Sequence, residues 1–407
     1  MIKKIAFYIL LFFIGNNTLA QKHNGNTNYK VETGAESMSE YIPLLRNKKV
    51  GVFANQTSMV GNVHLIDTLL KSGIIIKKIF GPEHGFRGTA SAGEHIKNSV
   101  DSKTGITVTS LYGKHTKPTE SDFKGIDILI FDIQDVGVRF YTYISSLEYF
   151  MESALEQNIP LIILDRPNPN GFYIDGPVLE PKFKSFIGMQ PIPVVYGMTV
   201  GEYAKMIVSE DWISRIAVNN YRKNPDAVKI ILCKNYDHNV KYELPVATSP
   251  NLPNMQSVYL YPSTCFFEGT VLSEGRGTDK PFQIFGHPSL PKNLFSFTPK
   301  PNKGARFSKC YNQKCYGWNL AGSVQEVLNE TDGKLQIKYI IDAYKLFPGK
   351  DSFFLKNEFF TKLAGNETLM AQIKAFTPER EIRDSWKPGI ENFKKIRKKY
   401  LLYKDFE

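Results

Sequence analysis

The chain has 407 residues, of which 42% are hydrophobic and 22% charged, a balance typical of a globular protein with room for two domains. Its formal net charge is +11, but the basic residues are spread out, apart from modest clusters such as residues 394–399. This pattern argues against a nucleic-acid-binding arm, and we expect no nucleic-acid partner. A diffuse positive surface suits an acidic polymer, such as a cell wall or an acidic sugar, or simply keeps the protein soluble.

The first twenty residues have the pattern of a secretory signal peptide. Two lysines precede an apolar run over residues 5–14, and small side chains predict cleavage after Ala20. The apolar run is too short for a membrane span. We therefore predict a signal peptide over residues 1–20 and a flexible lead-in over residues 21–36. The mature protein is expected to be secreted across the inner membrane into the periplasm, without a membrane span.

Short apolar runs alternate with amphipathic stretches from residue 48 onward. Strands are expected over residues 49–55, 74–81, 125–134, 159–167 and 228–234, and helices over residues 62–73, 143–158 and 199–212. Apolar runs without polar alternation indicate strands buried on both faces, and strand–helix–strand repetition indicates a parallel sheet with right-handed crossovers. We predict an α/β fold whose catalytic domain, residues 37–250, is Rossmann-like. The glycine patterns of dinucleotide and phosphate loops do not occur in the sequence, so we expect no cofactor.

The composition changes after about residue 250, where loops rich in Pro, Ser, Asn and aromatic residues precede helical patterns. We predict a second, smaller α+β domain over residues 251–407, which completes the substrate groove. Two of the four cysteines, Cys310 and Cys315, bracket a short loop, and the sequence leaves open whether they form a disulfide. The sequence contains no cysteine or histidine spacing typical of zinc sites, so we expect no metal.

Polar side chains gather at the carboxyl ends of the predicted strands, the edge at which open parallel sheets bind ligands. They are Asn55 and Gln56 after the first strand, Glu83, His84 and Arg87 after the second, Asp132, Gln134, Asp135, Arg139, Tyr141 and Tyr143 after the third, and Asp165 and Asn168 after the fourth. Because four separate strands deliver polar groups to one edge, we predict a functional site there.

Most of these residues also have a structural interpretation. Asp132 and Asp165 could cap a helix or brace a loop, and Asp135 could be an N-cap or an ion-pair partner. Glu83 is harder to explain in this way, because it stands between a proline and His84 in a glycine-flanked turn and caps no predicted helix. We therefore favour a reactive role for Glu83, which His84 could tune or orient.

The second predicted domain offers a further cluster within residues 266–282, a glycine-rich stretch that contains Glu268, Glu274 and Arg276. This stretch is either a charged hairpin or a loop that leans over the sheet edge and completes the site. In the second case, nearby aromatic rings supply faces for a sugar. The arginines suit a substrate carboxylate, whose two oxygens match the guanidinium fork.

Four long motifs together resemble a known family. They are GPEHGFRG (81–88), DIQDVGVRFYTYISSL (132–147), DRPNPNG (165–171) with GPVLE (176–180), and YPSTCFFEGTVLSEGRGTDKPF (261–282). The family is the one once labelled domain of unknown function 1343, whose characterised members are NamZ-type exo-β-N-acetylmuramidases of glycoside hydrolase family 171. The resemblance covers about residues 48–393. It implies an enzyme that releases terminal N-acetylmuramic acid from the non-reducing end of peptidoglycan fragments, such as MurNAc-GlcNAc, for cell-wall turnover or recycling.

Glycosidic bond cleavage needs one carboxyl as acid and usually a second as base or nucleophile. We predict Glu83 as the acid/base with His84 beside it, and Asp132, Asp135, Glu268 and Glu274 as candidates for the second carboxylate. The substrate's 2-acetamido group is an alternative nucleophile, and retention or inversion stays open. The remaining polar residues are predicted to bind substrate: Asn55, Gln56, Arg87, Gln134, Arg139, Tyr141, Tyr143, Asp165, Asn168, Glu268, Glu274 and Arg276.

Two other classes of function fit parts of the sequence. A non-catalytic peptidoglycan-binding protein would explain secretion and basic charge, but not several carboxylates gathered around an anionic ligand. Another hydrolase, such as an amidase or a metal-dependent esterase, would explain the carboxylates, though no metal-ligand spacing supports it. The G-x-S-x-G elbow of serine α/β-hydrolases does not occur in the sequence. The sequence does not indicate an oligomeric state.

Overall fold

The computed structural model describes residues 30–83, 85–87, 98–302 and 304–407, and Val31–Glu407 form one compact unit. The predicted signal peptide and residues 21–29 of the predicted lead-in lie outside the described residues. Residues 31–36, the end of that lead-in, pack against the central sheet. Gly34 opens a short 3₁₀ helix, η1 (Gly34–Glu36), and its backbone nitrogen donates to the carbonyl of Asp165 at 2.8 Å.

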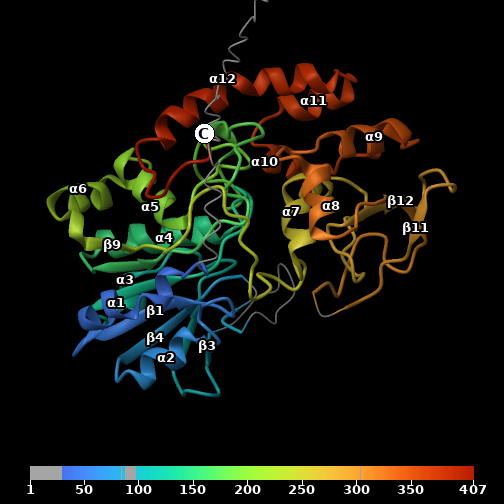
Figure 1. Ribbon diagram of the computed structural model, residues 1–407. Helices are drawn as coiled ribbons and strands as arrows, with labels where there is room; N and C mark the ends of the chain where they lie inside the picture. Colours follow the sequence, from blue (N-terminus) through green and yellow to red (C-terminus); the bar gives the residue numbers. More distant parts are fainter. Residues whose placement is uncertain (1–29, 84, 88–97, 303) are drawn as a thin grey trace, which may run out of the picture. The chain divides into compact units, whose positions relative to one another are not determined.

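The centre of the fold is a seven-stranded sheet with the order β5-β6-β4-β1-β7-β8-β9 (Figure 1). Its parallel strands are β1 (Lys49–Ala54), β4 (Ile75–Gly81), β6 (Thr107–Ser110), β7 (Ile128–Asp132), β8 (Leu161–Leu164) and β9 (Val228–Ile231), and β5 (Ser99–Val100) is an antiparallel edge strand. The strand order reverses at β1, which lies between β4 and β7. The loops after these strands therefore meet at the switch point where doubly wound sheets bind ligands.

Helices cover both faces of this sheet, which explains why its strands lack polar alternation. Phe53 and Phe131 pack on one face against Phe150 of α4 (Tyr143–Glu156), with ring centroids 5.0 and 6.3 Å away. The other face packs against α1 (Met38–Leu45) and α2 (Leu65–Lys71) through alternate residues such as Val52 and Ile130. This arrangement confirms the predicted α/β class with a Rossmann-like parallel sheet.

The other elements of the first half connect or flank the sheet. They are the small hairpin β2 (Met59–Val60) and β3 (Val63–His64), the helices α3 (Glu120–Phe123), α5 (Val200–Ser209) and α6 (Arg215–Lys223), and the 3₁₀ turns η2 (Pro181–Phe183) and η3 (Pro225–Ala227). Capping is well defined in α5, where the hydroxyl of Thr199 and the carboxylate of Glu202 form a reciprocal capping box.

The second half combines helices with a small antiparallel sheet of order β10-β12-β11. Its elements are α7 (Met255–Thr264), η4 (Cys265–Gly269), β10 (Ile284–His287), β11 (Phe295–Phe297), β12 (Cys315–Asn319), α8 (Val324–Thr331), α9 (Lys338–Leu346), η5 (Lys350–Ser352), α10 (Phe359–Ala364), α11 (Thr368–Lys374) and α12 (Glu379–Arg397). Within the described residues, none of the helices combines the length and apolar composition that a membrane span requires.

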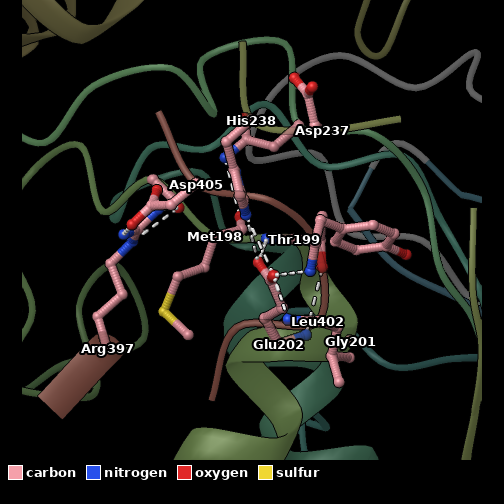
Figure 2. Close-up of polar contacts among 12 residues, drawn as sticks. Met198, Thr199, Gly201, Glu202, Asp237, His238, Arg397, Leu402 and Asp405 are labelled. Atoms are coloured by element: carbon pink, nitrogen blue, oxygen red, sulfur yellow. Dashed lines mark hydrogen bonds and ion pairs between the residues drawn. The ribbon is translucent and has the colours of Figure 1, made fainter. Parts of the chain in front are cut away.

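The chain after α12 returns to the first half and is held there by buried polar groups (Figures 1 and 2). The carboxylate of Glu202 accepts a hydrogen bond from the backbone of Leu402 at 2.8 Å and lies 3.1 Å from the ring of His238. Tyr403 donates its hydroxyl to Asp165 at 2.7 Å. The C-terminal segment therefore forms part of the interior of the parallel-sheet half.

Candidate active site

Glu83 lies in a tight turn directly after β4, at the carboxyl edge of the sheet. The turn is closed by a hydrogen bond from the backbone nitrogen of Gly85 to the carbonyl of Pro82 at 3.0 Å, and Gly85 has a φ of 76°, which favours glycine. Gly81 also allows a close approach, since a Cβ there would lie 3.1 Å from the backbone nitrogen of Phe86 and would push that backbone slightly aside. His84, predicted as a catalytic neighbour, lies outside the described residues.

Two hydroxyl donors orient the half-buried carboxylate of Glu83. Tyr112, which follows β6, donates to Oε1 at 2.8 Å, and Thr142, the N-cap residue of α4, donates to Oε2 at 3.3 Å. Burial, and after it the charge of Glu83, raises the pKa of Tyr112 well above its ordinary value, so the phenol keeps its proton. The carboxylate is thus held by donors from two different strand ends.

A second charged cluster comes from η4, the loop after it and the segment between β11 and β12. The guanidinium of Arg276 donates to Glu268 and lies 3.7 Å from Glu274, while the ammonium of Lys309 lies 2.8 Å from the other oxygen of Glu274. Lys309 also donates to the carbonyl of Thr270 at 3.0 Å. Two carboxylates and two cations therefore alternate in one network whose formal charges cancel.

The surroundings shift the pKa values of the two carboxyl groups of this network in opposite directions. Burial raises the pKa of Glu268; the charges of Glu274 and Glu83 add to this effect, and Arg276 opposes it. Burial acts on Glu274 in the same sense, but Lys309 and Arg276 outweigh it and lower the pKa of Glu274. Environments that separate the pKa values of neighbouring carboxyl groups are typical of acid and base pairs in active sites.

Electrostatic interactions connect the Glu83 turn to this network. The charge of Glu83 acts on Glu268, and Tyr112 responds to both Arg276 and Glu268. The structure therefore brings together four of the predicted site residues, Glu83, Glu268, Glu274 and Arg276. It adds Tyr112, Thr142 and Lys309, which the sequence did not single out. Tyr112 follows a short strand of mixed polarity, and Lys309 lies in an irregular loop, so neither position carried a strong pattern.

The predicted amide and tyrosine residues form a rigid support for residues 247–248. Asn55, fully buried, donates to the hydroxyl of Tyr143 at 3.0 Å. Tyr141 and Tyr143 donate to the carbonyl of Thr248 at 3.1 and 3.2 Å, and Gln56 donates to the same carbonyl at 2.9 Å. Hydrogen bonds within the protein engage these side chains, apart from the buried Oε1 atom of Gln56, and their contact with substrate stays a prediction.

Asp132, one of the predicted candidates for the second carboxylate, has an arginine partner inside the protein. It is fully buried at the end of β7 and accepts two hydrogen bonds from Arg166, at 2.6 and 2.9 Å. Asp135 is also buried, and its Oδ2 accepts hydrogen bonds from Tyr196 and the backbone of Gly137 at 2.7 and 2.6 Å. Burial raises the pKa of Asp135 to about 7, although both of these hydrogen bonds lower it.

Arg139, whose motif suggested a carboxylate ligand, is enclosed by backbone carbonyls of the protein. It is fully buried, and its guanidinium donates to four backbone carbonyls at 2.7 to 2.8 Å. They belong to Pro177, Ile192, Leu363 and Ala364. Without a carboxylate nearby, burial lowers the pKa of Arg139 to about 9. The residue ties α10 to the first half of the chain.

Three further predicted binding residues brace the loops at the ends of β7 and β8. Asp165 accepts hydrogen bonds from Thr199 at 2.7 Å and from Gly201 at 2.9 Å. Asn168 donates to the carbonyl of Met198 at 2.8 Å, and Gln134 donates to the carbonyl of Pro167 at 2.7 Å. All three side chains are buried and form hydrogen bonds within the protein, while the Oε1 atom of Gln134 accepts none from the described residues, and substrate binding by the three stays a prediction.

Arg87 keeps a partly exposed guanidinium beside the Glu83 turn. It forms an ion pair with Asp101 at 2.6 Å and packs over the ring of Phe86, while 42% of its side chain remains exposed. Among the described residues, no group of three or more His, Cys, Asp or Glu side chains is arranged to hold a metal ion.

Comparison with known proteins decides the family. Residues 50–256 match the model of the N-terminal part of the exo-β-N-acetylmuramidase NamZ, and residues 259–403 match that of its C-terminal part. The chain belongs to the NamZ family. The peptidoglycan β-N-acetylmuramidase NamZ of Bacillus subtilis (strain 168) is 37% identical over 430 residues, which span 98% of this chain and 99% of the relative. The family resemblance drawn from the four motifs is confirmed, and the protein is a glycosidase.

Two solved structures have the same fold. A DUF1343 family protein from Bacteroides fragilis is 44% identical, with a TM-score of 0.82, and the match covers 93% of this chain and all of that one. A second DUF1343 family protein from the same organism is 28% identical, with a TM-score of 0.75, over 92% of this chain and 99% of that one. The boundary between the two family models, near residues 256–259, falls at the start of α7.

Proposed function

We propose that this member of the NamZ family is an exo-acting muramidase that releases terminal N-acetylmuramic acid from the non-reducing end of peptidoglycan fragments. MurNAc-GlcNAc is the simplest such substrate. The observation that carries this proposal is the convergence of Glu83, oriented by Tyr112 and Thr142, with Glu268 and Arg276 at one edge of the sheet. The name of the Bacillus subtilis relative supports the same sugar.

In the proposed reaction, Glu83 is the acid/base that gives its proton to the oxygen leaving with the next sugar. Tyr112 and Thr142 fix both carboxylate oxygens, so the proton is delivered from a set position. Of the four candidates for the second carboxyl, Asp132 and Asp135 are buried, and each accepts a hydrogen bond from a side chain of the protein, that of Arg166 and that of Tyr196 respectively. Glu268 interacts with Glu83 and is the candidate that we favour.

Two arginines near the candidate site are proposed to bind the carboxylate of the substrate. Arg276 keeps a quarter of its side chain exposed while it holds Glu268, and Arg87 is partly exposed on the Glu83 turn. A guanidinium pairs well with the carboxylate that the lactyl ether of N-acetylmuramic acid carries. We further propose that the enzyme works in the periplasm after secretion, where cell-wall turnover or recycling supplies such fragments.

Product analysis tests this proposal directly. The protein would be incubated with MurNAc-GlcNAc and with intact glycan strands, and the released sugars identified by mass spectrometry. We expect free N-acetylmuramic acid from the disaccharide and single terminal residues from the strands. Larger oligosaccharides from the strands would overturn the exo-acting mode, and binding without any released sugar would favour a carbohydrate-binding protein. Activity that survives EDTA would exclude the metal-dependent esterase.

A further inference from the structure

Two cysteines face each other beside the charged network of the candidate active site. The backbone nitrogen of Gln313 donates to the carbonyl of Cys310 at 3.0 Å, which closes a turn, and Cys315 opens β12 directly after this turn. Each of the two thiol groups acts on the pKa of the other. The Sγ atom of Cys310 lies 3.8 Å from the carbonyl oxygen of Val271, and that of Cys315 lies 3.6 Å from the carbonyl oxygen of Gln313. The turn thus brings the two cysteines together at the ends of one short loop.

The two cysteines differ in exposure and in acidity. Cys310 is partly exposed, whereas Cys315 is fully buried. The hydrogen bond from Cys315 is the main cause that lowers the pKa of Cys310, and the neighbouring charge of Lys309 adds to it. The same contact raises the pKa of Cys315. An accessible thiol with a lowered pKa next to a buried thiol is the arrangement of an attacking and a resolving cysteine.

The two other cysteines lack such a partner. Cys233 and Cys265 are buried, and burial raises the pKa of each well above its ordinary value. The sulfur of Cys233 lies 3.3 Å from the carbonyl oxygen of Asp165. Both are therefore expected to stay as inert thiols, which makes them internal controls for any reaction of the first pair.

We propose that Cys310 and Cys315 form an intramolecular disulfide by exchange with a small-molecule or protein disulfide. The Cys310 thiolate attacks the external disulfide R–S–S–R, which forms a mixed disulfide and releases one RS⁻. Cys315 then loses its proton to a released thiolate and attacks the Cys310 sulfur, which expels the second RS⁻. In total, two protein thiols are oxidised, one external disulfide is reduced to two thiols, and both protons are carried by those thiols.

The disulfide between Cys310 and Cys315 would stabilise the charged network through Lys309, the residue that precedes Cys310. Lys309 holds the loop after η4 by its hydrogen bonds to the carbonyls of Phe267 and Thr270, and it pairs with Glu274. Closing the ring between residues 310 and 315 restricts the backbone on which Lys309 sits. The oxidised form is therefore expected to unfold at a higher temperature than the reduced form, because the disulfide limits the unfolded chain.

The experiment uses the full-length protein in a glutathione buffer that is mostly oxidised, followed by alkylation, trypsin and mass spectrometry. Cleavage at Lys309, Lys314 and Lys334 places the two cysteines on separate peptides, residues 310–314 and 315–334. We expect these peptides to be joined by a disulfide, and Cys233 and Cys265 to be alkylated. Four alkylated cysteines after incubation would overturn the proposal, as would a disulfide that involves Cys233 or Cys265.

Variants separate the two roles. Cys315→Ser is expected to accumulate a glutathione adduct on Cys310, whereas Cys310→Ser is expected to gain little, because the remaining thiol is buried. The opposite pattern would overturn the assignment of roles. Cys233→Ala serves as the matched control and should form the disulfide as the wild type does. The rise in melting temperature on oxidation, about 2–5 °C for a short loop, should disappear in Cys310→Ser.

Discussion

Two groups of charged residues lie near the carboxyl edge of the same sheet, and they differ in how their charges are satisfied. The inner group contains Asp132 and Arg166, whose side chains are almost completely buried and bound to each other by two hydrogen bonds. The outer group contains Glu83 and Glu268, which stay partly exposed and interact electrostatically. The inner group holds the strand ends in place, whereas the outer group, in which Glu268 pairs with Arg276, carries the catalytic role that we propose.

The difference teaches that a position after a strand is not enough to identify a reactive carboxylate. Asp132 ends one central strand of the sheet, Glu83 follows another, and both stand in family motifs. Asp132 has an arginine partner inside the protein, and Glu83 accepts hydrogen bonds from the hydroxyl groups of Tyr112 and Thr142. Five changes test this contrast, and they are arranged here by the size of the expected effect.

Glu83→Gln should have the largest effect on activity. The amide keeps the shape of the side chain but cannot give up a proton, so kcat is expected to fall by about a thousandfold or more. Hydrolysis of a para-nitrophenyl N-acetylmuraminide gives the rate, and a thermal scan should show an unchanged fold. Near-normal turnover by the variant would remove Glu83 from the mechanism.

Arg166→Met should have the largest effect on stability. It leaves the carboxylate of Asp132 buried without its partner, which costs about 3–5 kcal/mol in the free energy of unfolding. The double variant with Asp132→Leu removes both charges and should recover most of this loss. Urea denaturation measures all three proteins. A loss below about 1 kcal/mol in the single variant would contradict the structural role of the pair.

Glu268→Gln should reduce activity with little change in stability. As the proposed second carboxyl it supports the reaction that Glu83 begins, and we expect kcat to fall by about a hundredfold. The matched control is Glu330→Gln, which breaks a more exposed ion pair, that with Lys338 at 2.7 Å. Equal activity in the two variants would exclude Glu268 and turn attention to Glu274.

Asp135→Asn should change the pH dependence of stability. Its folded-state pKa of about 7 lies above the ordinary value of 3.8, so its stability contribution is complete below about pH 4 and is lost as the pH rises through 7. Replacement should flatten this decline by about 2 kcal/mol between pH 4 and 8, which allows for relaxation at the buried site. Glu148, whose pKa burial also raises to about 7, keeps part of the slope.

Chemical denaturation at several pH values measures this effect. Glu120→Gln, which removes an exposed carboxyl at the start of α3, should leave the slope of the wild type unchanged. An Asp135→Asn protein with the full wild-type decline would show that the burial of Asp135 does not affect folding through its ionisation.

Tyr112→Phe should have the smallest effect. It removes one of the two hydroxyl groups that orient Glu83, so kcat is expected to fall by about fivefold while KM stays nearly constant. Tyr311→Phe, a change at an exposed tyrosine, is the control. A rise in KM without a loss of kcat would indicate that Tyr112 binds substrate and does not position the carboxylate.

The parallel sheet was predictable because its strands carry their own signal. Residues such as Val52 and Phe53 are adjacent in sequence and buried on opposite faces, which produces the uninterrupted apolar runs. The strand β6 was not predicted, because Thr107–Ser110 is short and of mixed polarity. Tyr112, which follows it, was missed for the same reason.

The site was predictable only as a region. The strand-end rule found Glu83, and the glycine-rich stretch found Glu268 and Arg276. The strand-end rule could not distinguish Glu83 from Arg139. The four backbone carbonyls that accept hydrogen bonds from the guanidinium of Arg139 are far from it in sequence, between Pro177 and Ala364. Such partners exist only in the folded chain. The role of Lys309 had no local signal, since its contacts are to the loop after η4.

The anchoring of the C-terminal segment has a consequence for how the protein is made. Asp165 and Glu202 are buried in the parallel-sheet half, and some of their hydrogen-bond donors are supplied by Leu402 and Tyr403. A nascent or truncated chain that lacks residues 402 and 403 leaves these carboxylates without those donors. The interior of the parallel-sheet half is therefore completed only once these two residues have been synthesised and have docked.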